Sequence, residues 1–207
     1  MGYSDFTLKD VKTKFGLSTM EYLSLFDGVP DVAPSDLLGR TLHRVTALAV
    51  AISTEKAKSE LLTAPILTDV WAALRPRVSL FSGNEFSVDP ARGLNGYCDF
   101  ILSRAAEQAY IAAPVLVIVE AKNDLPTNGF GQCAAGMVAA RVFNEREGEP
   151  VRAVFGACTS GTVWRVLKLE ADVLYIDQPE YHITQVGKIL GILHHIMSEP
   201  AAPAAAA

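Results

Sequence analysis

The sequence predicts a domain of the α/β or α+β class, in which a central mixed β-sheet is flanked by helices and the N-terminal region is helical. Three observations support this class. The 207 residues are half apolar and one fifth charged, which suits a single buried core. Apolar residues recur at helical spacing through the first third of the chain. From residue 77 onward, short apolar segments bounded by Gly, Pro, Asn and Asp alternate with two further helical patterns.

The first third contains several helical patterns. Thr7 is a suitable N-cap with Asp10 three residues later, and Gly16 is suited to end that helix. Residues 35–52 carry apolar side chains at every third or fourth position. Two consecutive helical patterns occupy residues 55–75, and Pro65 is suited to the first turn of the second helix. We therefore expect helices before the sheet begins.

The rest of the chain changes to strand-like segments separated by turn residues. These segments are residues 77–83, 84–89, 96–103 and 114–122, then a hairpin of 151–161 and 162–170, and a short strand at 173–177. A helix rich in small residues is expected over 130–147, because small side chains allow close packing on a sheet. A final helix is expected from about residue 184 to 198.

The chain is expected to form one domain over residues 1–198, with residues 1–34 as an N-terminal extension packed on it. Residues 199–207, EPAAPAAAA, have the low complexity of a disordered tail. No apolar run approaches the roughly 20 residues needed to cross a bilayer. The first residues lack the apolar core of a signal peptide, so we expect a cytoplasmic protein without membrane contact.

Charge and cysteine content narrow the function classes. The net charge of −5 excludes a histone-like polycation, so any contact with nucleic acid must use a local basic surface. Cys98, Cys133 and Cys158 are far apart in sequence and form no CxxC pair. This spacing argues against a disulfide framework or a zinc site and predicts small buried apolar residues.

The segment VLVIVEAKND, residues 115–124, places a carboxylate and an ammonium at the end of an apolar strand. Side chains alternate along a strand, so Glu120 and Lys122 point to the same side. Charges beside the core cost free energy unless they pair, bind a ligand or lie at a wet cleft. One interpretation is a plain salt bridge, and the other is a functional site.

Asp99 is a second acid within an apolar strand, GYCDFILS. If the two strands are neighbours, Asp99 and Glu120 can share a hard cation such as Mg²⁺ (or Mn²⁺) with a backbone carbonyl, for which we choose Ala121. Such a metal lowers the pKa of a bound water and neutralises charge on phosphoryl oxygens. Lys122 would orient the attacking water. Together these groups suffice for phosphodiester hydrolysis.

This pattern of Asp99, then Glu120-Ala121-Lys122, followed by the helix that carries Gln132, resembles the PD-(D/E)XK nuclease superfamily. The longer stretch over residues 40–196 is similar to uncharacterised bacterial proteins of that superfamily, many of them cyanobacterial. The resemblance implies a restriction-endonuclease-like fold and Mg²⁺-dependent cleavage of nucleic acid. It also implies Asp99 and Glu120 as metal ligands and Lys122 as the water-positioning residue.

Two further residues follow from the resemblance alone. Glu60 matches an acid that many members place on the helix before the sheet to help hold the metal. Gln132 matches a polar residue that often contacts the site or the nucleic acid. Cys98 stands where the family has its proline, and the family includes members without cleavage activity. Alternatively, Glu60 forms an exposed ion pair with Lys56. Gln132 could instead hydrogen-bond to backbone groups at the start of its own helix.

The sequence therefore predicts a metal-dependent endonuclease-like phosphodiesterase that acts on DNA, with a metal-activated water as nucleophile. RNA or a small nucleotide is a further possible substrate. An alternative from another class is a catalytically silent nucleic-acid-binding or assembly subunit with the same fold. A homodimer is compatible with the class, but no interface pattern in the sequence supports it. No recognition-helix, zinc-finger or RNA-binding signature indicates sequence specificity.

Overall fold

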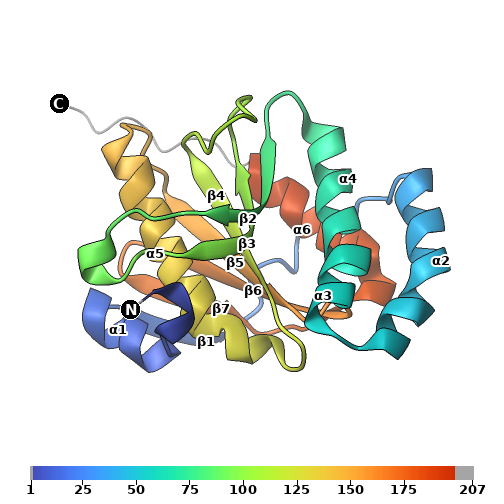
Figure 1. The fold of residues 1–207 in the computed structure, drawn as a ribbon, viewed down its shortest axis with the longest axis horizontal. Helices are drawn as coiled ribbons and strands as arrows, with labels where there is room; N and C mark the ends of the chain where they lie inside the picture. The colour runs from blue at the N-terminus through green and yellow to red at the C-terminus, as the bar shows by residue number, and fades with distance from the viewer. Residues whose placement is uncertain (1, 199–207) are drawn as a thin grey trace.

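A single mixed β-sheet runs through the middle of the protein in the computed structural model, which describes residues 2–198 (Figure 1). The strands lie in the order β1-β7-β6-β5-β4-β3-β2, and the short β8 pairs with β6. Their bounds are β1 Ser18–Leu23, β2 Ser79–Glu85, β3 Tyr97–Ser103, β4 Val115–Ala121, β5 Ala153–Thr159, β6 Val163–Glu170, β7 Val173–Asp177 and β8 Tyr181–His182. The α/β class expected from the sequence is confirmed.

The sheet is mixed because one parallel pair lies at its centre. Strands β2, β3 and β4 form an antiparallel meander, and β5, β6 and β7 form another. The pair β4–β5 is parallel, and α5 connects these two strands. A parallel pair needs such a crossover connection, and helices then cover the faces of the sheet. Strand β1 adds a second parallel pair at the edge beside β7.

Helices cover both faces of this sheet. They are α1 Leu8–Phe15, α2 Asp36–Ile52, α3 Glu55–Lys58, α4 Ala64–Leu74, α5 Phe130–Arg146 and α6 Val186–Ser198. A π-helical segment, η2 Ser59–Thr63, joins α3 to α4, and short 3-10 turns lie at η1 Tyr3–Asp5, η3 Pro90–Arg92, η4 Pro126–Gly129 and η5 Ile183–Gln185. Within residues 2–198, no helix has both the length and the apolar character to cross a membrane.

The expected helix starts are confirmed in atomic detail. The Thr7 hydroxyl accepts the backbone amide of Asp10, and the Asp10 carboxylate accepts that of Thr7, which is a capping box. Gly16 ends α1 with a φ of 68°, a left-handed conformation that glycine adopts without strain. Ser35 caps α2 through the backbone amide of Leu38 at 3.1 Å. These helix ends could be predicted from the sequence because each signal involves residues only three or four positions apart.

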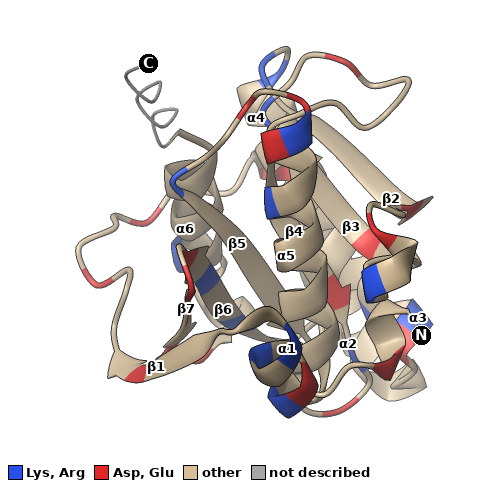
Figure 2. Ribbon diagram, turned by 90° about the vertical axis from the view of Figure 1, so that its left-hand side faces the viewer, with Lys and Arg blue, Asp and Glu red and all other residues tan. Residues whose placement is uncertain are grey.

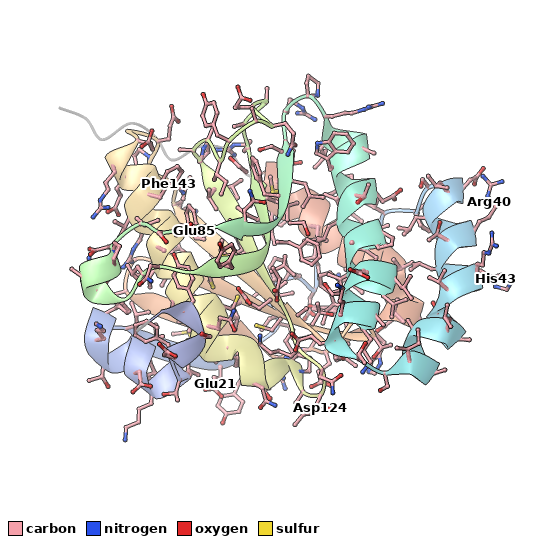
Figure 3. All side chains as sticks on the ribbon, in the orientation of Figure 1. Glu21, Arg40, His43, Glu85, Asp124 and Phe143 are labelled. Atoms are coloured by element: carbon pink, nitrogen blue, oxygen red, sulfur yellow. The ribbon has the colours of Figure 1, made fainter. Side chains whose placement is uncertain are left out.

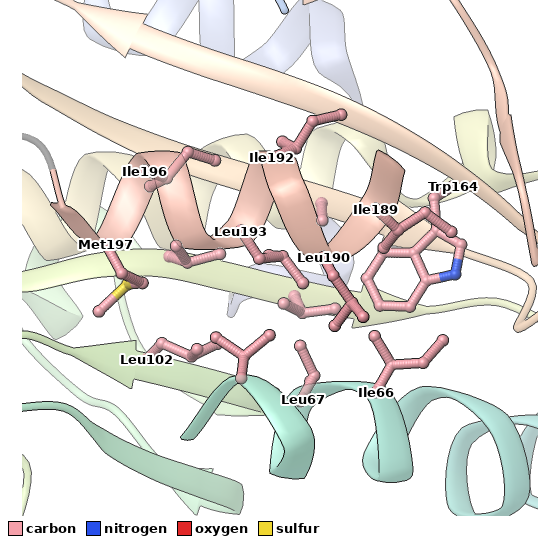
Figure 4. Close-up of a cluster of buried hydrophobic side chains, with 14 of the residues drawn as sticks. Ile66, Leu67, Leu102, Trp164, Ile189, Leu190, Ile192, Leu193, Ile196 and Met197 are labelled. Carbon is pink, nitrogen blue, oxygen red and sulfur yellow. The ribbon is translucent and has the colours of Figure 1, made fainter. Parts of the chain in front are cut away.

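Two hydrophobic cores lie on opposite faces of the sheet. On one face, α4 and α6 pack against the strands and against each other, and Trp164 lies beside Ile189 (Figure 4). On the other face, α5 lies across β4 and β5 together with α1. Gly136 allows this close approach, because a Cβ there would lie 3.1 Å from a methyl of Ile118. The small residues of α5 therefore serve packing, as the sequence predicted.

Two expectations about the elements need correction, and one short strand was not expected. Residues 1–34 do more than pack on the domain, because they contribute the edge strand β1. The segment 84–89 is not a separate strand: Asn84 and Glu85 simply complete β2. Strand β8 was not predicted. The expected tail, residues 199–207, lies outside the described residues.

Candidate metal and catalytic site

The candidate site lies where strands β3 and β4 diverge. Their antiparallel ladder pairs Phe100 with Val119, and beyond this pair no ladder partner is formed between them. The next amide of β4, that of Ala121, donates instead to the carboxylate of Asp99 at 2.7 Å. A side chain thus replaces a backbone acceptor at the point of divergence. This substitution fixes the Asp99 carboxylate beside the end of β4.

Glu120 is the only charged residue of the two central strands β4 and β5, whose ribbons are otherwise tan in Figure 2. Its side chain is 0 % exposed. Neither carboxylate oxygen accepts a hydrogen bond from any residue that the structure describes. A buried carboxylate without a donor is costly, so this position calls for a proton or a cation.

The environment of Glu120 raises its pKa well above its usual range. Burial is the largest cause, and the adjacent negative charge of Asp99 is the next. Burial and the neighbouring carboxylate both disfavour the ionised form of Glu120, so this environment favours its protonated form. The same two acids, after burial, also raise the pKa of the Cys98 thiol. The site is therefore strongly electronegative until a proton or cation occupies it.

Lys122 lies at the end of β4, on the same side as Glu120. Its backbone amide donates to the carbonyl of Thr159 at 2.7 Å, which extends the pairing with β5 by one residue. Its Nζ lies 3.9 Å from Glu120 and 3.0 Å from the Oε1 of Gln132. The ammonium lowers the pKa of Glu120, but burial and Asp99 together raise it more. A simple salt bridge therefore does not satisfy Glu120.

Gln132 reaches the site from the first turn of α5, and its side-chain oxygen accepts a hydrogen bond from the Lys122 ammonium. Gly129, just before α5, makes this approach possible. A Cβ at Gly129 would lie 3.2 Å from the Lys122 side chain and 3.2 Å from the Sγ of Cys158. The start of α5 thus presses directly on the aliphatic stem of Lys122 and holds its ammonium in place.

Glu60 is not brought into this group. It lies in η2 with its side chain 64 % exposed, and its carboxylate is 3.8 Å from the Nζ of Lys56. It borders a surface groove between α2 and α4, together with Leu37 and Asp69. The exposed ion pair with Lys56 is the arrangement that the structure contains. Asp99, Glu120, Lys122 and Gln132 gather without it.

The three cysteines were expected to be buried apolar residues, and they are all buried and free. Their spacing along the chain did not indicate that they converge on the site. Cys158 lies beside Glu120 in the parallel pair of β4 and β5, and Cys133 of α5 interacts with Cys158. The hydrogen bond with Cys158 is the largest cause of the raised pKa of Cys133, and burial is the next. Cys158 also contributes to the raised pKa of Glu120, after burial and Asp99.

Two carboxylates and the carbonyl of Ala121 are the oxygen ligands that this arrangement offers. Within residues 2–198 there is no group of three or more His, Cys, Asp or Glu side chains placed to hold a metal ion. Comparison of the chain with protein-family models and with curated proteins gave no match.

Proposed function

We propose that the protein is a metal-dependent nuclease with a restriction-endonuclease-like fold, which hydrolyses phosphodiester bonds of DNA. The observation that carries the proposal is the pair of unsatisfied oxygens on Glu120. Both are buried, lie beside a second carboxylate and have no donor among the described residues. A divalent cation would supply what this site lacks, because Mg²⁺ and Mn²⁺ prefer carboxylate and carbonyl oxygens. The residues present therefore fit such an ion.

In this proposal Asp99, Glu120 and the carbonyl of Ala121 hold the cation. When bound, the cation would neutralise negative charge on the substrate phosphate and lower the pKa of a water molecule. The hydrogen bond from Ala121 to Asp99 keeps that carboxylate oriented before any ligand arrives. Glu60, paired with Lys56 at the surface, is not needed for this set of ligands.

The role of Lys122 is to orient the attacking water and to place a positive charge near the phosphate. Gln132 holds the Lys122 ammonium at 3.0 Å, and Gly129 packs on its stem. An ammonium has three donors, so Lys122 can keep its bond to Gln132 and still donate to a water and a phosphate oxygen. Fixed positioning of this kind is a large part of what an active site contributes to phosphoryl-group chemistry.

The test is to incubate the purified protein with single-stranded, duplex and branched DNA, and with RNA, with and without Mg²⁺ or Mn²⁺. Metal-dependent cleavage is expected for the wild type and should be lost in Lys122→Ala. Lys168→Ala is the matched control, since that lysine pairs with Glu170 on β6, away from the site. A folded Lys122→Ala protein that cleaves like the wild type would refute the role of Lys122. A wild type that binds nucleic acid, but does not bind metal and does not cleave, would favour the catalytically silent subunit.

A further inference from the structure

Three segments from separate parts of the chain meet beside the end of β4. The first is α3, which ends at Lys58, and the second is the turn that follows Lys122. The third is the turn between β5 and β6, where Gly161 has a φ of 81° and a Cβ would lie 2.8 Å from the Cβ of Lys58. Figure 3 shows Asp124, in the second of these turns, at the lower rim of the molecule near the start of α5. These contacts fix the stem of Lys58 next to the candidate site.

The ammonium of Lys58 points at the backbone just beyond Lys122. Its Nζ donates to the carbonyl of Asn123 at 2.9 Å. No ion pair with a carboxylate is formed by Lys58 among residues 2–198, whereas Lys56 on the same helix pairs with Glu60. An ammonium has three donors, so two remain available to a ligand. Lys58 therefore presents a fixed positive charge that is not paired with any acid within the described part of the chain.

We propose that Lys58 binds a backbone phosphate of the nucleic-acid substrate, next to the phosphate that a cation at Asp99 and Glu120 would bind. This inference rests on the proposed nuclease function and adds a binding residue to it. Phosphate contacts of this kind position the strand without reading its sequence. The substrate strand would then cross the molecule from the carboxylate pair over the turn at Asn123 towards α3. Asp124 brings a carboxylate to that turn, so Asp124→Asn should strengthen binding.

The experiment measures binding of a labelled oligonucleotide without divalent metal, so that no cleavage occurs, over a range of salt concentrations. Lys58→Met keeps the stem that packs on Gly161 and removes the charge. It should weaken binding about tenfold, the lower end expected for a hydrogen bond between charged partners. It should also reduce the slope of log K against log salt by about 0.7 to 0.9, the change for one lost phosphate contact. Lys58→Arg should restore most of the affinity.

Lys56→Met is the matched control, because that side chain is 82 % exposed and already paired. It should change affinity by less than about twofold. Equal binding and equal salt slopes for Lys58→Met and the wild type would overturn the inference, and would leave the nuclease proposal intact if the wild type cleaves with metal. A wild type that binds neither DNA nor RNA would overturn the inference as well, and the cleavage assay would then decide the nuclease proposal separately.

Discussion

The carboxylate of Asp99 accepts the backbone amide of Ala121 at 2.7 Å, at the point where β3 and β4 diverge. This bond joins one proposed metal ligand to the backbone of another. It also explains why an acid can be accommodated in an otherwise apolar strand: its side chain completes a hydrogen-bond pattern that the backbone of β3 no longer reaches. The geometry of the site is thus built into the pairing of the sheet.

The first prediction concerns the stability supplied by this bond. Asp99→Asn and Asp99→Ala both remove the charge beside Glu120, but only asparagine retains an oxygen that can accept from Ala121. We expect Asp99→Ala to be less stable than Asp99→Asn by about 1–3 kcal/mol, the cost of leaving a buried donor unsatisfied. Urea unfolding without metal measures the difference. Equal stability of the two variants would show that the bond contributes nothing.

The second prediction concerns pH. Because burial and Asp99 raise the pKa of Glu120 above its usual value of 4.5, the folded protein keeps a proton that the unfolded chain releases. As the pH rises above 4.5, folding requires proton uptake, so stability falls until the folded pKa is passed. The loss is at most about 1.4 kcal/mol for each pH unit in that window. Stability from this group is therefore greatest at low pH.

Glu120→Gln removes this dependence because glutamine does not titrate. The stability of the variant relative to the wild type should increase from pH 5 to pH 8, as measured by urea unfolding in the presence of a chelator. Glu60→Gln is the control, since Glu60 is exposed and paired at the surface. If the gap between Glu120→Gln and the wild type stayed constant over this range, Glu120 would not carry the retained proton.

The third prediction concerns Gly129. Its φ of −89° is accessible to alanine, so the backbone allows the substitution. A Cβ would nevertheless press on Lys122 and on Cys158 at 3.2 Å. Gly129→Ala should shift the ammonium and lower the rate of cleavage by roughly tenfold or more, because small misplacements of catalytic groups are costly. The single-turnover rate at saturating metal measures the effect.

Gly39→Ala is the matched control for this prediction. Gly39 lies in the exposed part of α2, and nothing lies within 4 Å of a Cβ there. Alanine should stabilise that helix by about 0.5–1 kcal/mol and leave cleavage unchanged. Equal cleavage rates for Gly129→Ala and the wild type would mean that the contact with Lys122 does not position it.

The sequence predicted most elements because their signals are local. Helix caps, apolar periodicity and turn residues all act over a few positions, and they located the helices and most strands. Strand β1 was missed because its residues, Ser18–Leu23, are almost all exposed and show no apolar alternation. What makes it a strand is its distant partner β7, with Ser18 beside Val173. Pairing over more than 150 residues leaves no trace in a local pattern.

The site was predictable to a similar extent. Alternation along a strand placed Glu120 and Lys122 on one side, and the structure brings them together with Asp99 and Gln132. The convergence of the cysteines depends on which strands are neighbours, and spacing in the sequence does not encode this. Glu60 was inferred from a resemblance, and whether it faces the site depends on the rotation of its helix about its axis. The π-helical segment that contains it changes that rotation.

The central claim is that Asp99 and Glu120 together hold a divalent cation, and calorimetric titration with Mn²⁺ at pH 8 tests it most directly. The wild type should bind one ion per chain, with Glu60→Gln binding like the wild type and both Asp99→Asn and Glu120→Gln losing the site. Absence of binding by the wild type, or unchanged binding after Glu120→Gln, would contradict the account.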